Sequence, residues 1–219
     1  MPVEIDYRVR RATRARRVRV RVDPEHGVEV VLPLRAPAAA AAAAVAELSP
    51  WIEQRLAELE RARALLAREH GWLPYLDQRL RLVVEPSRRQ AHRRGDALLV
   101  PAGDGARAAI ERWYRRAART EVTERLDAAT AATGTSYSRL AIRNQRTRWG
   151  SCGRGGAMSF NWRLLLAPER VLDYVVWHEV CHLEVADHSA RFWALLDVRC
   201  PGWREPAAWL RANGSALVL

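Results

Sequence analysis

The sequence of 219 residues is 49% hydrophobic and contains nine Trp, which excludes global disorder, and its odd number of cysteines, three, argues against a disulfide framework. It has no apolar run long enough to cross a membrane and no basic-then-apolar layout at its N-terminus, so we expect a cytoplasmic protein. All 36 basic residues are Arg, and the net charge of +11 permits nucleotide or nucleic-acid contact but is weak evidence for it, because a chain without Lys also reflects genome composition.

The first part of the chain is predicted to be a β-hairpin followed by helices. Residues 17–22 alternate Arg and Val strictly, which places three Arg on one face of a strand and three Val on the other. We expect this arginine face to be solvated rather than to bind phosphate. The other expected elements are strands over residues 3–11 and 28–32 and helices over 38–48 and about 51–69.

The middle and C-terminal parts are predicted to mix strands and helices. Residues 105–133 have the apolar spacing of a long amphipathic helix, which Gly134 ends. The other expected elements are strands over residues 75–85, 97–101, 138–145 and 157–166, and helices over 189–198 and about 205–212.

The stretch His178-Glu179-Val180-Cys181-His182 is an H-E-x-x-H motif in a helix predicted to begin near Pro168. On a helix, His178 and His182 project from the same face, where two neutral imidazoles can hold one zinc ion. His188 follows six residues later and can close in from the turn beyond. Glu179 points about 100° around the helix from His178, which suits a general base for a metal-activated water. The motif therefore predicts a catalytic zinc site.

The spacing leaves the remaining ligand open. Glu184 and Asp187 are the rivals of His188, and both are also candidates for hydrogen bonds to imidazole N–H groups. Three neutral imidazoles would leave the ion its full positive charge and a fourth position for water. Cys181 lies about 80° from the ligand face, so we interpret it as a small buried residue.

Several groups of residues resemble the YgjP-like metallopeptidase family of bacteria. They are Arg148–Cys152, Ser159–Leu164, Asp173–Leu183, Asp187–Ser189 and Phe192–Trp193. The chain is also similar to the WLM and SprT-like zinc peptidases, which share the short catalytic core. The close resemblance runs from about Ser138 to the C-terminus, and the N-terminal part follows the family layout more loosely.

The resemblance implies zinc held by His178, His182 and His188, with Glu179 as the catalytic acid/base. By the same resemblance, Arg148 and Asn161 are the best candidates for substrate contact. The glycine that metzincins carry after the second histidine is replaced by Val185. The turn to the third ligand must therefore differ from the metzincin one.

These observations predict an α+β protein with an N-terminal β-hairpin and helix region over residues 1–104. A zincin-like metallohydrolase domain with the H-E-x-x-H helix is predicted over residues 105–219. The predicted function is hydrolysis of peptide bonds in a peptide or protein, with one zinc ion per chain. In zincins an edge strand docks an extended peptide, and we expect the strand over 157–166 to run beside the motif helix.

Two other functions remain open. The same metal chemistry could hydrolyse a nucleotide phosphoanhydride, an alternative prompted by the arginine-rich surface. A nucleic-acid-binding module with a structural zinc is the non-enzymatic alternative, and the Glu of H-E-x-x-H argues against it. A long groove beside an exposed strand would favour a peptide, and a closed pocket lined by Arg would favour a nucleotide.

Overall fold

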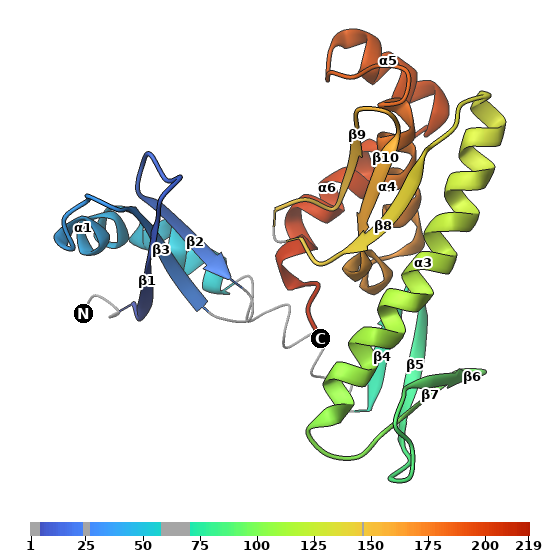
Figure 1. Ribbon diagram of the computed structural model, residues 1–219, viewed down its shortest axis with the longest axis horizontal. Coiled ribbons are helices and arrows are strands. Elements are labelled where there is room, and N and C mark those ends of the chain that lie inside the picture. Colours follow the sequence, from blue (N-terminus) through green and yellow to red (C-terminus); the bar gives the residue numbers. More distant parts are fainter. Residues whose placement is uncertain (1–4, 24–26, 58–70, 146) are drawn as a thin grey trace. The chain divides into compact units, whose positions relative to one another are not determined.

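The computed structural model describes residues 5–23, 27–57, 71–145 and 147–219 (Figure 1). The chain has the predicted α+β fold and divides into an N-terminal unit, Met1–Arg68, and a C-terminal unit, Glu69–Leu217. All the candidate metal and acid/base residues lie beyond residue 104, and the domain boundary at 104/105 stays a prediction. Among the described helices, none has the length and apolar character to cross a membrane.

The N-terminal unit contains a three-stranded sheet of order β1–β3–β2. Strand β1 (Tyr7–Ala12) runs parallel to β3 (Gly27–Pro33), and β2 (Arg19–Asp23) runs antiparallel to β3. The side chains of β2 alternate between the two faces as predicted: Val20 packs against the core, and Arg19 is exposed. The predicted turn at His26 lies outside the described residues.

Helical residues complete the core of this unit. Helix α1 spans Ala39–Glu47, and residues 49–57 are helical as well. The rest of the second predicted helix, to about residue 69, lies outside the described part of the chain. The buried core residues come from β3 and from these helical segments: Val28, Val30, Leu32, Ala41, Val45 and Ile52.

The C-terminal unit begins with a four-stranded sheet of order β4–β5–β7–β6. Its strands are β4 (Trp72–Tyr75), β5 (Gln78–Val84), β6 (His92–Arg94) and β7 (Ala97–Val100). The sequence predicts β5 and β7 but not β4 as a separate strand, nor β6. Strand β4 turns into β5 through Leu76, which has φ 55° without being Gly or Asn. The usual sequence signal for a tight hairpin is therefore missing.

Helix α3 (Gly105–Thr133) has the predicted bounds and ends at Gly134, whose φ of 66° suits a residue without a side chain. In Figure 1 the four-stranded sheet lies at its N-terminal end and the second sheet lies along its C-terminal half. Trp113 and Tyr114 of α3 share one hydrophobic cluster with Leu80 of β5 and Phe160 of the second sheet. The cluster joins both sheets into one unit.

The second sheet has the order β8–β10–β9. It consists of β8 (Arg139–Arg143), β9 (Gly150–Gly153) and β10 (Ala157–Asn161). The predicted strand over 157–166 is wrong beyond Asn161, because Trp162–Leu166 form a 3₁₀ helix, η1. The Asn161 side chain accepts a hydrogen bond from the Arg163 N–H at 3.1 Å and caps this helix. A short apolar run does not distinguish a strand from a buried helical turn.

The position of β10 also corrects a prediction. Strand β10 pairs with β8 on one side and with β9 on the other, so it is the central strand. The edge strand that contacts the motif helix is β9. Its sequence, Gly-Ser-Cys-Gly, contains no β-branched or aromatic residue, so nothing local predicts a strand there.

Three helices and a short 3₁₀ helix form the C-terminal part of this unit. They are α4 (Glu169–Cys181), α5 (Ala190–Arg199), α6 (Arg204–Asn213) and η2 (Gly214–Ala216). Helix α4 contacts α3, α5 and α6. The apolar face of α4 is buried through Val171, Leu172, Val175, Val176 and Val180. This burial fixes the face on which the motif histidines project.

Candidate metal centre

The three predicted histidines come together at the C-terminal end of α4. His178 lies in the last turn of the helix, His182 is its C-cap, and His188 lies in the following loop. The Nε2 atom of His188 is 3.0 Å from Nε2 of His178 and 3.2 Å from Nε2 of His182. Among the described residues these three form the cluster that could hold a metal ion.

The spacing of these nitrogens fits a metal ion. Two nitrogens bound to a tetrahedral zinc at about 2.0 Å lie about 3.3 Å apart, close to the separations found here. The Nδ1 atom of His182 is 3.0 Å from the carbonyl oxygen of Val185, which can only accept a hydrogen bond. In the neutral ring the proton therefore lies on Nδ1, and the lone pair of Nε2 faces the cluster.

The return of the chain to His188 needs no glycine. The N–H groups of Glu184 and Val185 both donate to the carbonyl of Cys181, at 3.1 and 3.0 Å. Among the described residues, Leu76 is the one non-glycine with a positive φ, so the turn from His182 to His188 adopts ordinary backbone angles. With Val185 at the position of the metzincin glycine, these hydrogen bonds shape the turn.

Two aromatic side chains of α5, Phe192 and Trp193, pack against the imidazole rings. The ring of Phe192 on α5 lies 4.9, 4.5 and 4.8 Å from the ring centres of His178, His182 and His188. Trp193 lies beside His188, with 5.5 Å between ring centres. Because packed rings have few alternative rotamers, Phe192 and Trp193 hold the imidazole nitrogens in position.

A second layer of aromatic side chains packs against Trp193. Trp203 stacks on Trp193 with ring centres 4.9 Å apart and on Tyr174 with ring centres 6.0 Å apart. Tyr174 in turn lies 5.9 Å from the ring of His178. Sequence reasoning assigned no part of the site to Tyr174 or Trp203, because their approach depends on the packing of α4 against the start of α6.

Burial favours the neutral imidazoles that bind metals. Desolvation lowers the pKa of His178 to about 4, with a further contribution from His182 and His188. Desolvation and the charge of His182 also lower the pKa of His188, against the opposite effect of Asp187. At neutral pH both rings are therefore uncharged.

The two rival ligands have other partners. The Glu184 carboxylate accepts a hydrogen bond from the Arg199 guanidinium at 2.9 Å. The Asp187 carboxylate accepts one from the Ser189 N–H at 3.2 Å, next to the start of α5. Each carboxylate therefore forms a hydrogen bond with a residue outside the three-histidine cluster.

Glu179 is buried, with 6% of its surface exposed. Desolvation raises its pKa to about 7, against the opposing effects of a hydrogen bond from the Cys152 backbone N–H and the positive charge of Arg148. A carboxylate that titrates near neutrality suits proton transfer.

Strand β9 makes room for Glu179 at Gly150. A Cβ atom at Gly150 would lie 2.6 Å from Oε1 and 2.7 Å from Cγ of Glu179. Such distances are shorter than van der Waals contact, so only glycine allows the carboxylate to lie against the strand. Sequence reasoning missed this role of Gly150, although the residue belongs to the family-like stretch Arg148–Cys152.

The two candidate substrate residues lie in different settings. Arg148 is exposed, and its charge acts on Glu179. Asn161 is 2% exposed, and its amide donates to the Gln145 carbonyl at 2.8 Å and accepts from the Arg163 N–H. Because both groups of the Asn161 amide are engaged, its contacts favour a positioning role.

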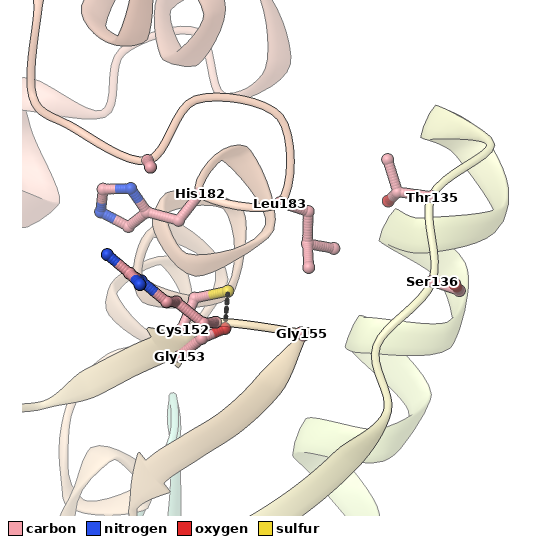
Figure 2. Close-up of a pocket in the computed structure, with 10 residues that line it drawn as sticks. Thr135, Ser136, Cys152, Gly153, Gly155, His182 and Leu183 are labelled. Atoms are coloured by element: carbon pink, nitrogen blue, oxygen red, sulfur yellow. Dashed lines mark hydrogen bonds between the residues drawn. The ribbon is translucent and has the colours of Figure 1, made fainter.

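A cavity of about 580 Å³ opens beside His182. Figure 2 shows Leu183, after the end of α4, on the side of Thr135 and Ser136, which follow α3, whereas the ring of His182 points away from these two residues. The β9–β10 hairpin completes the lining. The described lining residues are Thr135, Ser136, Cys152, Gly153, Arg154, Gly155, Gly156, His182, Leu183 and Ala186.

Cys181, predicted to be a small buried residue, is 1% exposed and packs with Val185, Phe192 and Leu196. Cys152 is half-buried and lines the cavity. Burial raises the pKa of its thiol, as does the nearby charge of Glu179. This environment disfavours a nucleophilic thiolate.

Comparison with known proteins identifies a family. The model of the YgjP-like metallopeptidase domain matches residues 16–213. No curated protein matches the chain. The metallopeptidase zymogen of Pyrococcus abyssi abylysin is 22% identical, with a TM-score of 0.38, and the match covers 42% of this chain and 93% of that one. The metallopeptidase zymogen of Methanocaldococcus jannaschii jannalysin is 14% identical, with a TM-score of 0.38 and coverage of 42% and 95%.

Proposed function

This chain belongs to the YgjP-like metallopeptidase family, and on that premise we propose that His178, His182 and His188 hold one zinc ion and that Glu179 is the general base. As a member of this family, the protein is a zinc-dependent hydrolase whose substrates are peptides or proteins. The observation that supports the ligand assignment is the convergence of three imidazole nitrogens on one point.

The proposed third ligand is His188. Its ring nitrogen lies within the cluster, whereas the carboxylates of Glu184 and Asp187 are engaged by Arg199 and Ser189. Three imidazoles without a protein carboxylate leave a tetrahedral zinc one further position, as in catalytic zinc sites. When bound, zinc supplies Lewis-acid chemistry, polarising a carbonyl and lowering the pKa of water to about 7.

The proposed role of Glu179 is proton transfer. Its carboxylate takes the proton of the attacking water and delivers it to the nitrogen of the leaving amine. Burial against Gly150 excludes bulk water from the carboxylate, and the Cys152 N–H holds it in place. Burial also brings its pKa close to neutrality, where a group can both accept and return a proton.

The proposed docking site for the peptide is the free edge of β9. Among the described strands β9 is paired with β10 alone, and although the Cys152 N–H on its other side bonds Glu179, an extended peptide can bond the remaining backbone groups of that edge. This edge lies next to α4 and Glu179. A substrate added there is brought alongside the metal ligands. No comparable observation favours a phosphoanhydride, because among the described lining residues of the cavity Arg154 is the single arginine.

The test combines Glu179→Gln with metal analysis and a peptide-hydrolysis assay. The amide has almost the same shape as the carboxylate but does not accept a proton. We expect the variant to hold about one zinc per chain and to cleave peptides at less than about a hundredth of the wild-type rate. Full activity in this variant would overturn the assignment of the base, and loss of zinc would mean that Glu179 holds the site together.

A further inference from the structure

We propose that Arg154 selects substrates that carry a carboxylate in the residue entering the cavity beside His182. The proposal rests on the proposed function, and it adds the substrate class. The carboxylate belongs either to an Asp or Glu side chain or to the C-terminus of a peptide, since both present the same charged group.

The cavity is the place where a substrate side chain fits next to the metal. Its volume of about 580 Å³ lies in the usual range of ligand pockets. Because His182 is one of its lining residues, whatever fills it lies next to a proposed zinc ligand. Among the described lining residues, Arg154 is the one Arg, Asp or Glu, and so the one permanently charged side chain.

The turn that carries Arg154 is held in place. Gly155 and Gly156 follow it with φ of 74° and 75°, and the carbonyl of Gly156 accepts a hydrogen bond from the Ser138 N–H at 2.9 Å. A Cβ atom on Gly156 would lie 3.3 Å from the Ser136 carbonyl oxygen, so the turn packs closely on the segment after α3. Arg154 is therefore presented from a fixed backbone.

The acidic groups around the metal centre are engaged away from Arg154. Glu184 is paired with Arg199, Asp187 caps α5 at Ser189, and Glu179 lies against Gly150. None of these carboxylates lines the cavity. A bound zinc ion would add positive charge at the same end. The cavity is therefore electropositive, and a substrate carboxylate is the group that complements it.

The geometry of β9 decides which substrate residues reach the cavity. Side chains alternate between the two faces of a strand. Cys152 lines the cavity, whereas Ser151 points to the other face, where its hydroxyl lies 2.8 Å from that of Ser159. A peptide added to the edge of β9 alternates in the same way. Every second residue then faces the cavity, so the requirement for a carboxylate applies to one position next to the scissile bond.

The experiment uses peptides that differ only in Glu, Gln or Lys at each position around the cleaved bond, with free and amidated C-termini. Cleavage by the zinc-loaded protein is compared with that by Arg154→Ala and Arg154→Glu. We expect wild type to prefer Glu over Gln by about threefold to tenfold in kcat/KM at one position, as for a partly exposed charged contact. Arg154→Ala should lose the preference, and Arg154→Glu should favour Lys. Arg112→Glu, on the exposed face of α3, makes the same charge change and should keep the wild-type preference.

A binding measurement separates the two proposals. Fluorescence anisotropy of the same peptides on zinc-loaded Glu179→Gln protein, with and without Arg154→Glu, reports recognition without turnover. Equal binding of Glu, Gln and Lys peptides, or a preference unchanged by Arg154→Glu, overturns the role of Arg154. Selective binding without hydrolysis by wild type would support Arg154 and contradict the peptidase function. A preference restricted to free C-termini would assign the carboxylate to the end of the peptide.

Discussion

At the scale of single residues, the candidate metal centre depends on groups that keep the three imidazoles aimed at one point. The carbonyl of Val185 orients His182, and Phe192 packs under all three rings. A histidine with a neighbour of this kind loses less conformational freedom when it binds a metal ion.

Removal of one ligand tests the cluster. We expect His178→Ala to lose zinc, because two remaining imidazoles and water hold the ion poorly. Metal content by inductively coupled plasma mass spectrometry checks the result. His92→Ala is the control, since His92 is exposed on β6, away from the cluster, and should keep about one zinc per chain. Wild-type zinc content in His178→Ala would refute the site.

Gly150→Ala tests the contact between β9 and Glu179. The added methyl group would lie 2.6 Å from Oε1 of Glu179, so the carboxylate or the strand must move. We expect zinc content to be kept while kcat falls at least about tenfold, since a displacement of the base of about 1 Å is costly. Gly105→Ala at the start of α3 is the control, because nothing lies within 4 Å of its added Cβ. Equal activity of the two variants would contradict the close approach.

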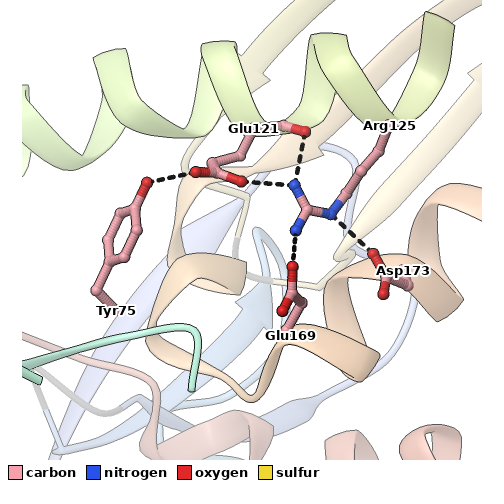
Figure 3. A network of polar contacts seen from close by, with 5 residues as sticks. All are labelled: Tyr75, Glu121, Arg125, Glu169 and Asp173. Atoms are coloured by element: carbon pink, nitrogen blue, oxygen red, sulfur yellow. Dashed lines mark hydrogen bonds and ion pairs between the residues drawn. The ribbon is translucent and has the colours of Figure 1, made fainter. Parts of the chain in front are cut away.

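At the scale of elements, the motif helix is fixed by a polar network as well as by its apolar face. Figure 3 shows Arg125 of α3 bonded to Glu121 on its own helix and to Glu169 and Asp173 of α4. Glu121 also accepts a hydrogen bond from the Tyr75 hydroxyl at 2.7 Å. The Arg125 guanidinium thus connects the first turns of α4 to α3. Through Glu121 the network also reaches Tyr75 in the first sheet of this unit.

Arg125→Gln should therefore destabilise the C-terminal unit. Loss of the guanidinium leaves three carboxylates facing one another, and we expect a cost of about 1–2 kcal/mol, reduced because Glu169 and Asp173 are half exposed. Urea unfolding with zinc present measures it. Arg115→Gln is the control, since it breaks an i,i+4 pair with Glu111 on the surface and should cost less than about 0.5 kcal/mol. Equal costs would mean that the network contributes no more than a surface pair.

At the scale of the whole molecule, each unit has its own core. The N-terminal core is centred on Val30, Leu32 and Ile52, and the C-terminal core contains Trp162 and Leu126. All the proposed zinc ligands belong to the C-terminal unit. Binding of the ion therefore stabilises one unit directly.

Thermal unfolding of the full chain should reflect this division. We expect removal of zinc by a chelator to lower the midpoint of the C-terminal unit, by the equivalent of about 2.7 kcal/mol when free zinc is 100 times its dissociation constant. The N-terminal transition should stay at the same temperature. Calorimetry with and without zinc measures both, and His178→Ala should show no zinc-dependent shift. Parallel shifts of the two transitions would indicate that the units unfold together.

Much of the chemistry was evident from local sequence. The i,i+4 spacing of His178 and His182 on a helix predicts a shared face, because helix geometry is set by short-range hydrogen bonds. The bounds of α3 were predicted for the same reason, through its periodicity and Gly134. The candidate ligands and base were named from H-E-x-x-H and the family resemblance, and they remain predictions until metal and activity are measured.

Other features depend on contacts between residues distant in sequence. Strand β9 has no strand-like composition, and only pairing with β10 makes it an edge beside α4. The apolar run after Asn161 is a different case, because η1 begins at a local cap between Asn161 and Arg163 that composition does not reveal. The cavity at Arg154 and the approach of Glu179 to Gly150 likewise arise where separate segments meet. The sequence by itself determined the α-helices outlined above and the candidate metal ligands, through short-range periodicity and the H-E-x-x-H motif, and tertiary packing alone decided which strand lies at the edge and what surrounds the site.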